Sequence, residues 1–169
     1  MVSLVAISTE NRSWVNEIKA GPPELYQLHY NAQWYGQSCL HDDVWSFLVQ
    51  DGAEDYCGFI TYGQCYEDEY LSANKVNGTG EICHLVISPE KQRQGIGSES
   101  LKLACEDLAN KGYDEVRVAH SPESRSARAF YVALGFEPFG INYDGDPYLS
   151  KRLMPDKPRV TGGTAIPTR

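Results

Sequence analysis

The chain has 169 residues, 41% of them hydrophobic and 22% charged, with a formal net charge of -8. This length and composition are typical of one soluble domain that buries a substantial core. The negative charge argues against binding to nucleic acid or to an anionic membrane, because contacts with phosphate groups need Lys and Arg.

The first half of the chain predicts a mixture of strands and helices. Thr9 is a suitable N-cap for a helix, which Gly21-Pro22-Pro23 would stop. Asp51-Gly52, between two strand-like runs, is a strong hairpin signal. The expected elements, in chain order, are a strand over 1–7, a helix over 9–20, a helical stretch over 24–34, and strands over 44–49 and 56–62.

The second half predicts a strand–helix–strand unit followed by a helix and two strands. Apolar residues at helical spacing, Leu101, Ala104, Cys105 and Leu108, mark the first of these helices. A unit of this length implies two parallel strands joined by a right-handed crossover. The expected elements are a loop over 67–80, a strand over 81–87, a helix over 97–111, a strand over 115–119, a helix over 124–134, and strands over 136–141 and 148–153.

These elements form a single predicted domain over residues 1–153. The remaining segment, 154–169, is rich in Pro, Gly and Thr and has little to bury. We expect it to be a tail that is flexible or packs on a neighbouring subunit, which leaves a homodimer open.

The cysteines and the termini indicate the setting of the protein. The sequence contains five Cys residues, an odd number, scattered and without a C-x-x-C pair. We therefore expect no metal site and a reducing, cytoplasmic setting. No apolar run approaches the roughly 18 residues of a membrane helix, and no secretory signal pattern begins the chain.

The most informative segment is Gln92-Arg93-Gln94-Gly95-Ile96-Gly97, between a predicted strand and a predicted helix. A strand, a glycine loop and a helix N-terminus together form a common binding arrangement for phosphate. A P-loop is excluded because no Lys follows Gly97. A dinucleotide fingerprint is excluded because Ser100 stands where the third glycine should be.

This loop resembles the Q/R-x-x-G-x-G/A loop with which the GNAT superfamily of N-acetyltransferases binds the pyrophosphate of acetyl-CoA. Downstream, Ala127-x-x-Phe130-Tyr131-x-x-x-Gly135-Phe136 resembles the family signature N-x-x-A-x-x-[FL]-Y-x-x-x-G-F. By these two motifs the chain is identified as a member of that family. Ser124 stands where the family has Asn, and its hydroxyl can still hydrogen-bond to the cofactor, with a shorter reach.

The resemblance implies an α/β (α+β) GNAT-like fold. Its central twisted sheet would be mixed, with about six to seven strands, flanked by about four helices and splayed at the cofactor cleft. Acetyl-CoA would be the co-substrate, with pantetheine on the backbone of the strand over 81–87 and pyrophosphate on the glycine loop. The implied cofactor-binding residues are Leu85, Val86, Ile87, Gln92, Arg93, Gln94, Gly95, Ile96, Gly97, Ser98, Ser124 and Tyr131.

The resemblance also implies two catalytic side chains. Tyr131 would protonate the leaving thiolate, although it could be only a core aromatic. Glu81 would be the base, at the position of the catalytic glutamate in the histone-acetylating branch, although it could be only a solvated carboxylate. Regular alternation puts Glu81, Cys83, Leu85 and Ile87 on one face of the strand. His84, a second candidate base, then points to the other face unless a bulge intervenes.

The predicted function is transfer of an acetyl group from acetyl-CoA to a primary amine by direct attack. No positioned cysteine suggests a covalent acetyl-enzyme. The net charge and the Glu67-Asp68-Glu69 loop favour a small cationic amine as acceptor. The alternatives are a peptide or protein as acceptor, and a GNAT-like module that binds acyl-CoA without turnover.

Overall fold

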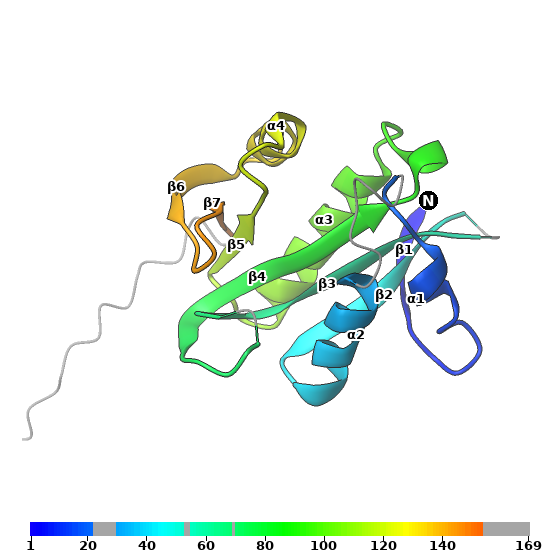
Figure 1. Ribbon diagram of the computed structural model, residues 1–169, viewed down its shortest axis with the longest axis horizontal. Helices are drawn as coiled ribbons and strands as arrows, with labels where there is room; N and C mark the ends of the chain where they lie inside the picture. Colours follow the sequence, from blue (N-terminus) through cyan, green and yellow to red (C-terminus); the bar gives the residue numbers. More distant parts are fainter. Residues whose placement is uncertain (22–29, 53–54, 69, 154–169) are drawn as a thin grey trace, which may run out of the picture.

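The computed structural model describes residues 1–21, 30–52, 55–68 and 70–153. Seven strands form one open sheet in the order β1-β2-β3-β4-β5-β7-β6 (Figure 1). The strands are β1 (Val2–Ala6), β2 (Val44–Asp51), β3 (Tyr56–Tyr66), β4 (Lys75–Ile87), β5 (Glu115–Ala119), β6 (Glu137–Ile141) and β7 (Pro147–Arg152). The helices are α1 (Trp14–Glu17), α2 (Tyr30–Leu40), α3 (Ile96–Asn110) and α4 (Arg125–Ala133), with a short 3-10 turn, η2 (Pro89–Lys91). The mixed sheet with its flanking helices confirms the predicted fold class.

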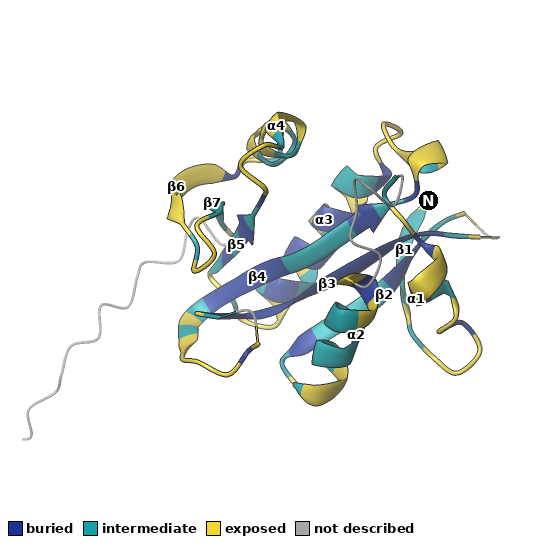
Figure 2. Cartoon of the chain, viewed as in Figure 1, coloured by how far each residue is buried: buried dark blue, intermediate teal, exposed yellow. Residues whose placement is uncertain are grey.

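The sheet is covered on both faces, which gives two hydrophobic layers. The amphipathic helix α3 packs on one face, and α1 and α2 pack on the other. The α3 layer includes Ile60, Tyr62, Ile82, Leu101, Leu108 and Val116. The opposite layer includes Val15, Ile18, Leu48, Phe59 and Val86. Figure 2 shows burial concentrated along β3 and β4, whereas every residue of β6 is exposed.

The parallel pair β4–β5 is paired over only part of its length. Their ladder runs from Thr79–Glu115 to Ile82–Val118 and ends there, although β4 continues to Ile87. Beyond Ile82 the edge of β4 that faces β5 has no strand partner among the described residues. The strand–helix–strand prediction is thus confirmed, and the two strands separate at their carboxyl ends.

A β-bulge in β4 overturns the predicted alternation of its side chains. The register with β3 pairs Ile82 with Tyr62 and His84 with Thr61, so Cys83 is the extra residue. After the bulge, Leu85 and Ile87 pack with Ile82 in the α3 layer, while Val86 packs in the opposite layer. Glu81 and His84 therefore share the α1–α2 face, and the prediction that Glu81 lies on one face with Leu85 and Ile87 is wrong. An extra residue reverses the alternation of every side chain that follows it.

Other element boundaries differ from the sequence prediction. The first helix is a single turn, α1, preceded by turns in which Asn11 bonds to Ser8 and Ala6. The predicted loop over 67–80 already contains the start of β4 at Lys75. Residues 24–29 of the second predicted helix, and the tail over 154–169, lie outside the described residues. None of the helices in the described ranges is long and apolar enough to span a membrane.

Candidate active site

A cavity of about 540 Å³ lies where β4, the N-terminus of α3 and the helix α4 converge. It sits at the end of β4 that has separated from β5. Its lining brings together ten of the predicted cofactor-binding residues: Leu85, Val86, Ile87, Gln92, Arg93, Gly95, Gly97, Ser98, Ser124 and Tyr131. Ala20, Ser126, Ala127 and Phe130 complete it.

The glycine loop presents the N-terminus of α3 to this cavity. Gly95, the N-cap, has φ 83°, a left-handed conformation that glycine adopts without strain. A Cβ on Gly95 would meet no atom within 4 Å, and one on Gly97 would approach Ile87 and Phe130 at 3.6 Å. The loop therefore leaves open space above the first amides of a 15-residue helix. Unpaired amides and the positive end of the helix dipole suit such a site to an anion.

Three predicted loop residues use their side chains for structure. The amide of Gln92 donates to the carbonyls of Ala20 and Ile87, both at 2.8 Å, and ties the loop to the sheet. Gln94 donates to the carbonyl of Glu90 at 2.9 Å, and Ile96 is buried in the core. Neither Gln94 nor Ile96 lines the cavity. These residues can reach a ligand only through their backbone amides.

Helix α4 supplies the opposite wall. Ser124 caps it by accepting a hydrogen bond from the amide of Ala127 at 3.3 Å. The ring of Tyr131 packs edge-on against Phe130 and Phe136, with centroids 5.1 and 5.7 Å apart. Burial raises the pKa of Tyr131 to about 12, and its hydroxyl has no hydrogen-bond partner among the described residues. The hydroxyl stays protonated and is available to a ligand.

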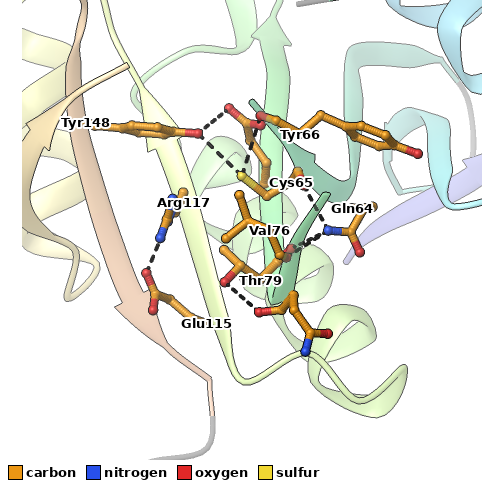
Figure 3. Close-up of polar contacts among 10 residues, drawn as sticks. Gln64, Cys65, Tyr66, Val76, Thr79, Glu115, Arg117 and Tyr148 are labelled. Atoms are coloured by element: carbon orange, nitrogen blue, oxygen red, sulfur yellow. Dashed lines mark hydrogen bonds and ion pairs between the residues drawn. The ribbon is translucent and has the colours of Figure 1, made fainter. Parts of the chain in front are cut away.

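Glu81 lies on the α1–α2 face and does not line this cavity. Its side chain is buried, with 8% exposed. The hydroxyl of Tyr148 donates to its Oε1 at 3.0 Å. Burial raises the pKa of Glu81 to about 7, against the lowering effects of Tyr148, the Cys65 thiol and the charge of Arg117. Figure 3 shows the Tyr148 hydroxyl directed toward Cys65, and Arg117 directed toward Glu115.

The structure gives His84 a role unsuited to a base. Asn31 donates both amide hydrogens to the carbonyls of Val15 and Ile18 at 2.9 and 2.8 Å. Its Oδ1 is then an acceptor, so Nε2 of His84, at 2.7 Å, must be the donor. Burial lowers the pKa of His84 to about 4. The imidazole is thus neutral, holds α2 against β4, and binds a proton weakly.

Two residues near the separated strands escaped the sequence prediction. One is Tyr148, whose partner Glu81 lies 67 residues away. The other is His120, at the end of β5, with 8% of its surface exposed. Its Nδ1 donates to the carbonyl of Ser121 at 2.7 Å, and Nε2 is buried without a partner among the described residues. A lone Tyr and a lone His carry no sequence signal for such roles, which depend on long-range packing.

The acidic loop has a local structural function. Asp68 accepts hydrogen bonds from the amides of Tyr70, Ser72 and Ala73, which lowers its pKa despite some desolvation. Glu67 is exposed, and Glu69 lies outside the described residues. Within the described ranges no group of three or more His, Cys, Asp or Glu side chains could hold a metal ion.

A comparison with models of known protein families identifies the family of the chain. A model of the "Acetyltransferase (GNAT) family" matches residues 9–136. The chain belongs to the GNAT acetyltransferase family. A comparison with curated protein sequences gave no significant match.

Solved structures agree on the GNAT fold. An aminoglycoside acetyltransferase in complex with coenzyme A is 18% identical, with a TM-score of 0.70 over 90% of this chain and 95% of that one. The PaiA N-acetyltransferase of Thermoplasma acidophilum, also with coenzyme A, is 18% identical, with a TM-score of 0.66 over 90% and 99%. A ribosomal-protein alanine N-acetyltransferase of Escherichia coli is 14% identical, with a TM-score of 0.63 over 99% and 100%. At these identities the likeness concerns the fold alone.

Glu81 should make the stability of this GNAT protein depend on pH. The fold raises its pKa from 4.5 to about 7, so folding favours the protonated carboxyl. Its contribution is fully present below about pH 4.5 and is lost as the pH rises to about 7. Glu81→Gln should abolish a loss of about 3 kcal/mol in the free energy of unfolding across this interval.

Chemical denaturation at a series of pH values measures this difference. Glu115→Gln, which changes a half-buried carboxyl on the neighbouring strand, is the matched control and should leave the pH dependence close to that of the wild type. Parallel curves for wild type and Glu81→Gln would contradict the raised pKa.

Proposed function

We propose that this GNAT protein is an N-acetyltransferase that moves an acetyl group from acetyl-CoA to a primary amine by direct attack. One observation carries the proposal. A single cavity joins an exposed helix N-terminus, the open β5-facing edge of β4 and the available hydroxyl of Tyr131. An anion site, a strand edge and a proton donor are the three features that a CoA thioester requires of a protein.

The donor side uses mainly backbone groups of this chain. Amides between Arg93 and Ser98 would hold the pyrophosphate at the start of α3. The stretch over 85–87, paired with β3 on one side and open on the side of β5, would bind the pantetheine amides as a substitute strand would. A backbone N–H of that stretch would also stabilise negative charge on the thioester oxygen. Acetyl-CoA itself supplies the activated acetyl group.

Tyr131 would assist departure of the CoA sulfur. Its pKa of about 12 keeps the hydroxyl protonated until the carbon–sulfur bond breaks. The burial that disfavours a phenolate also disfavours a bare thiolate, so donation from the hydroxyl to sulfur is worth more here than in water. The hydroxyl of Tyr131 would therefore donate a hydrogen bond to the sulfur and deliver its proton as the carbon–sulfur bond breaks.

Glu81 would take the proton that the attacking amine loses. A pKa of about 7 matches a base that works near neutral pH. Because Glu81 does not line the cavity, the proton would pass through water. The weak basicity of His84 and its bond to Asn31 favour Glu81 over that residue.

For the acceptor we propose a small primary amine that is cationic in solution. The net charge of -8 and the carboxylate of Glu81 support this class. Asp68 supports it less than the sequence suggested, because loop amides already surround its carboxylate. A screen of CoA release across polyamines, aminoglycosides, amino acids and peptides tests the proposal. Release with peptides alone would identify a protein acetyltransferase, and tight binding without release would identify a non-catalytic module.

Gly97 provides the test of the cofactor site. Gly97→Val should weaken acetyl-CoA binding at least about tenfold, because the new side chain would enter the space that the phosphates need. The fold should persist, since its Cβ meets neighbours only at ordinary contact distance. Gly36→Val, on helix α2 with open space around it, is the control. Calorimetry that finds wild-type affinity in Gly97→Val would refute the assignment of the loop.

Tyr131→Phe tests the proton donor. The ring should keep its contacts with Phe130 and Phe136, so acetyl-CoA binding should persist. The turnover number should fall about 10²–10⁴-fold if the hydroxyl acts on sulfur. Single-turnover kinetics measure the chemical step, and a loss below about threefold would leave Tyr131 with a packing role only.

Glu81→Gln tests the base. The loss in kcat/KM should be largest near neutral pH, where the acceptor amine is mostly protonated, and should shrink toward alkaline pH. The acid limb, which should report the pKa of about 7 in the wild type, should be replaced by one at higher pH that follows deprotonation of the acceptor amine. A uniform loss from neutral to alkaline pH would mean that Glu81 positions the acceptor instead.

A further inference from the structure

We propose that Tyr148 is a positioning residue for the base, fixing the orientation of the Glu81 carboxylate on the α1–α2 face of the sheet. This inference rests on the proposed role of Glu81. Neither GNAT motif in this sequence includes Tyr148, which lies on β7, on the far side of β5 from Glu81.

The topology explains how the two side chains meet. β5 lies between β4 and β7, and Tyr148 is paired across the ladder with Ala119 of β5. Alanine carries only a methyl group, so the phenol can pass over β5 and reach β4. Its hydroxyl ends 3.0 Å from Oε1 of Glu81. A larger side chain at Ala119 would occupy this path.

The phenol ring is held in place from neighbouring strands. Tyr148 has 7% of its surface exposed and stacks on Phe139 of β6, with centroids 5.1 Å apart and planes 30° apart. The guanidinium of Arg117 lies over both rings, 4.8 Å from Phe139 and 5.8 Å from Tyr148. Arg117 is itself oriented by its Nε, which donates to Glu115 at 3.3 Å. A ring fixed in this way holds its hydroxyl in one direction.

The hydrogen-bond directions follow from the neighbouring thiol. Cys65 lies with its Sγ 3.6 Å from the Tyr148 hydroxyl. Burial raises the pKa of Cys65 to about 12, so the thiol keeps its proton. Carboxylate oxygen is a far stronger acceptor than sulfur, and the single hydroxyl proton therefore goes to Glu81. The Glu81 carboxylate is thus oriented through Oε1 by Tyr148, and the Cys65 thiol also hydrogen-bonds to it.

The bond also adjusts the basicity of Glu81. The titratable and charged groups that act on the carboxylate are Cys65 of β3, Cys83 of β4, Arg117 of β5 and Tyr148 of β7. Burial raises the pKa of Glu81, and the hydrogen bond from Tyr148 lowers it. Without this bond the carboxyl would remain protonated to higher pH.

Tyr148→Phe removes the hydroxyl and keeps the ring stacked between Phe139 and Arg117. We expect the acid limb of kcat/KM against pH to move upward by about one pH unit, as expected for the loss of a hydrogen bond to a charged group. Activity near pH 6 should fall about tenfold, while the affinity for acetyl-CoA stays unchanged. Tyr66→Phe is the matched control, because Tyr66 is also buried and donates to a carboxylate, that of Asp43, at 2.8 Å.

A carbon-13 NMR titration of the Glu81 carboxyl, in wild type and Tyr148→Phe, reports the same shift without turnover. The inference is supported if the titration of the Glu81 carboxyl shifts upward in Tyr148→Phe and not in the control variant. The upward shift of the acid limb should also be absent from the kcat/KM profile of the double variant Tyr148→Phe/Glu81→Gln. An unchanged Glu81 titration in Tyr148→Phe overturns it, whatever the activity. If Glu81→Gln alone retains the acid limb at about pH 7, the proposed base is wrong, and the titration still decides whether Tyr148 acts on Glu81.

Discussion

The separation of β4 from β5 beyond Ile82 is the constraint on which the site depends. Up to that residue the backbones of the two parallel strands hydrogen-bond to one another. Beyond it β4 continues to Ile87, with the edge that faces β5 open. Buried backbone groups need partners, so an open edge lined by a cavity is a site for a ligand that offers amides of its own. The glycine loop and α4 close around this edge and line the rest of the cavity.

The bulge at Cys83 places the side chains of β4 that matter for the proposed reaction on two different faces of the sheet. It turns Leu85 and Ile87 toward α3, where the acetyl donor would bind, and leaves Glu81 and His84 on the α1–α2 face. A regular strand would have placed Glu81 together with Leu85 and Ile87. In the proposed reaction, donor and base would approach a reaction centre between the strands from opposite sides, and water would carry the proton between the amine and Glu81.

Burial that hydrogen bonds only partly offset shifts the pKa values of three side chains near this site. It raises the pKa of Glu81 to about 7 and that of Tyr131 to about 12, and it lowers that of His84 to about 4. The three groups thus differ in their suitability as base, acid and structural donor. For Glu81 the hydrogen bond from Tyr148 is the largest of the interactions that keep the pKa from rising further.

The sequence alone determined the elements whose signals are local. The loop over 92–97, the helix α3, the strand β5 and the capped helix α4 follow from glycine conformation, apolar spacing and capping, which act within a few residues. Only the tertiary structure decided the bulge at Cys83, the neutral His84 bound to Asn31, and the contacts of Tyr148 and His120. Each of these depends on partners distant in the sequence and on how far packing excludes solvent, and no short stretch of chain specifies either of these conditions.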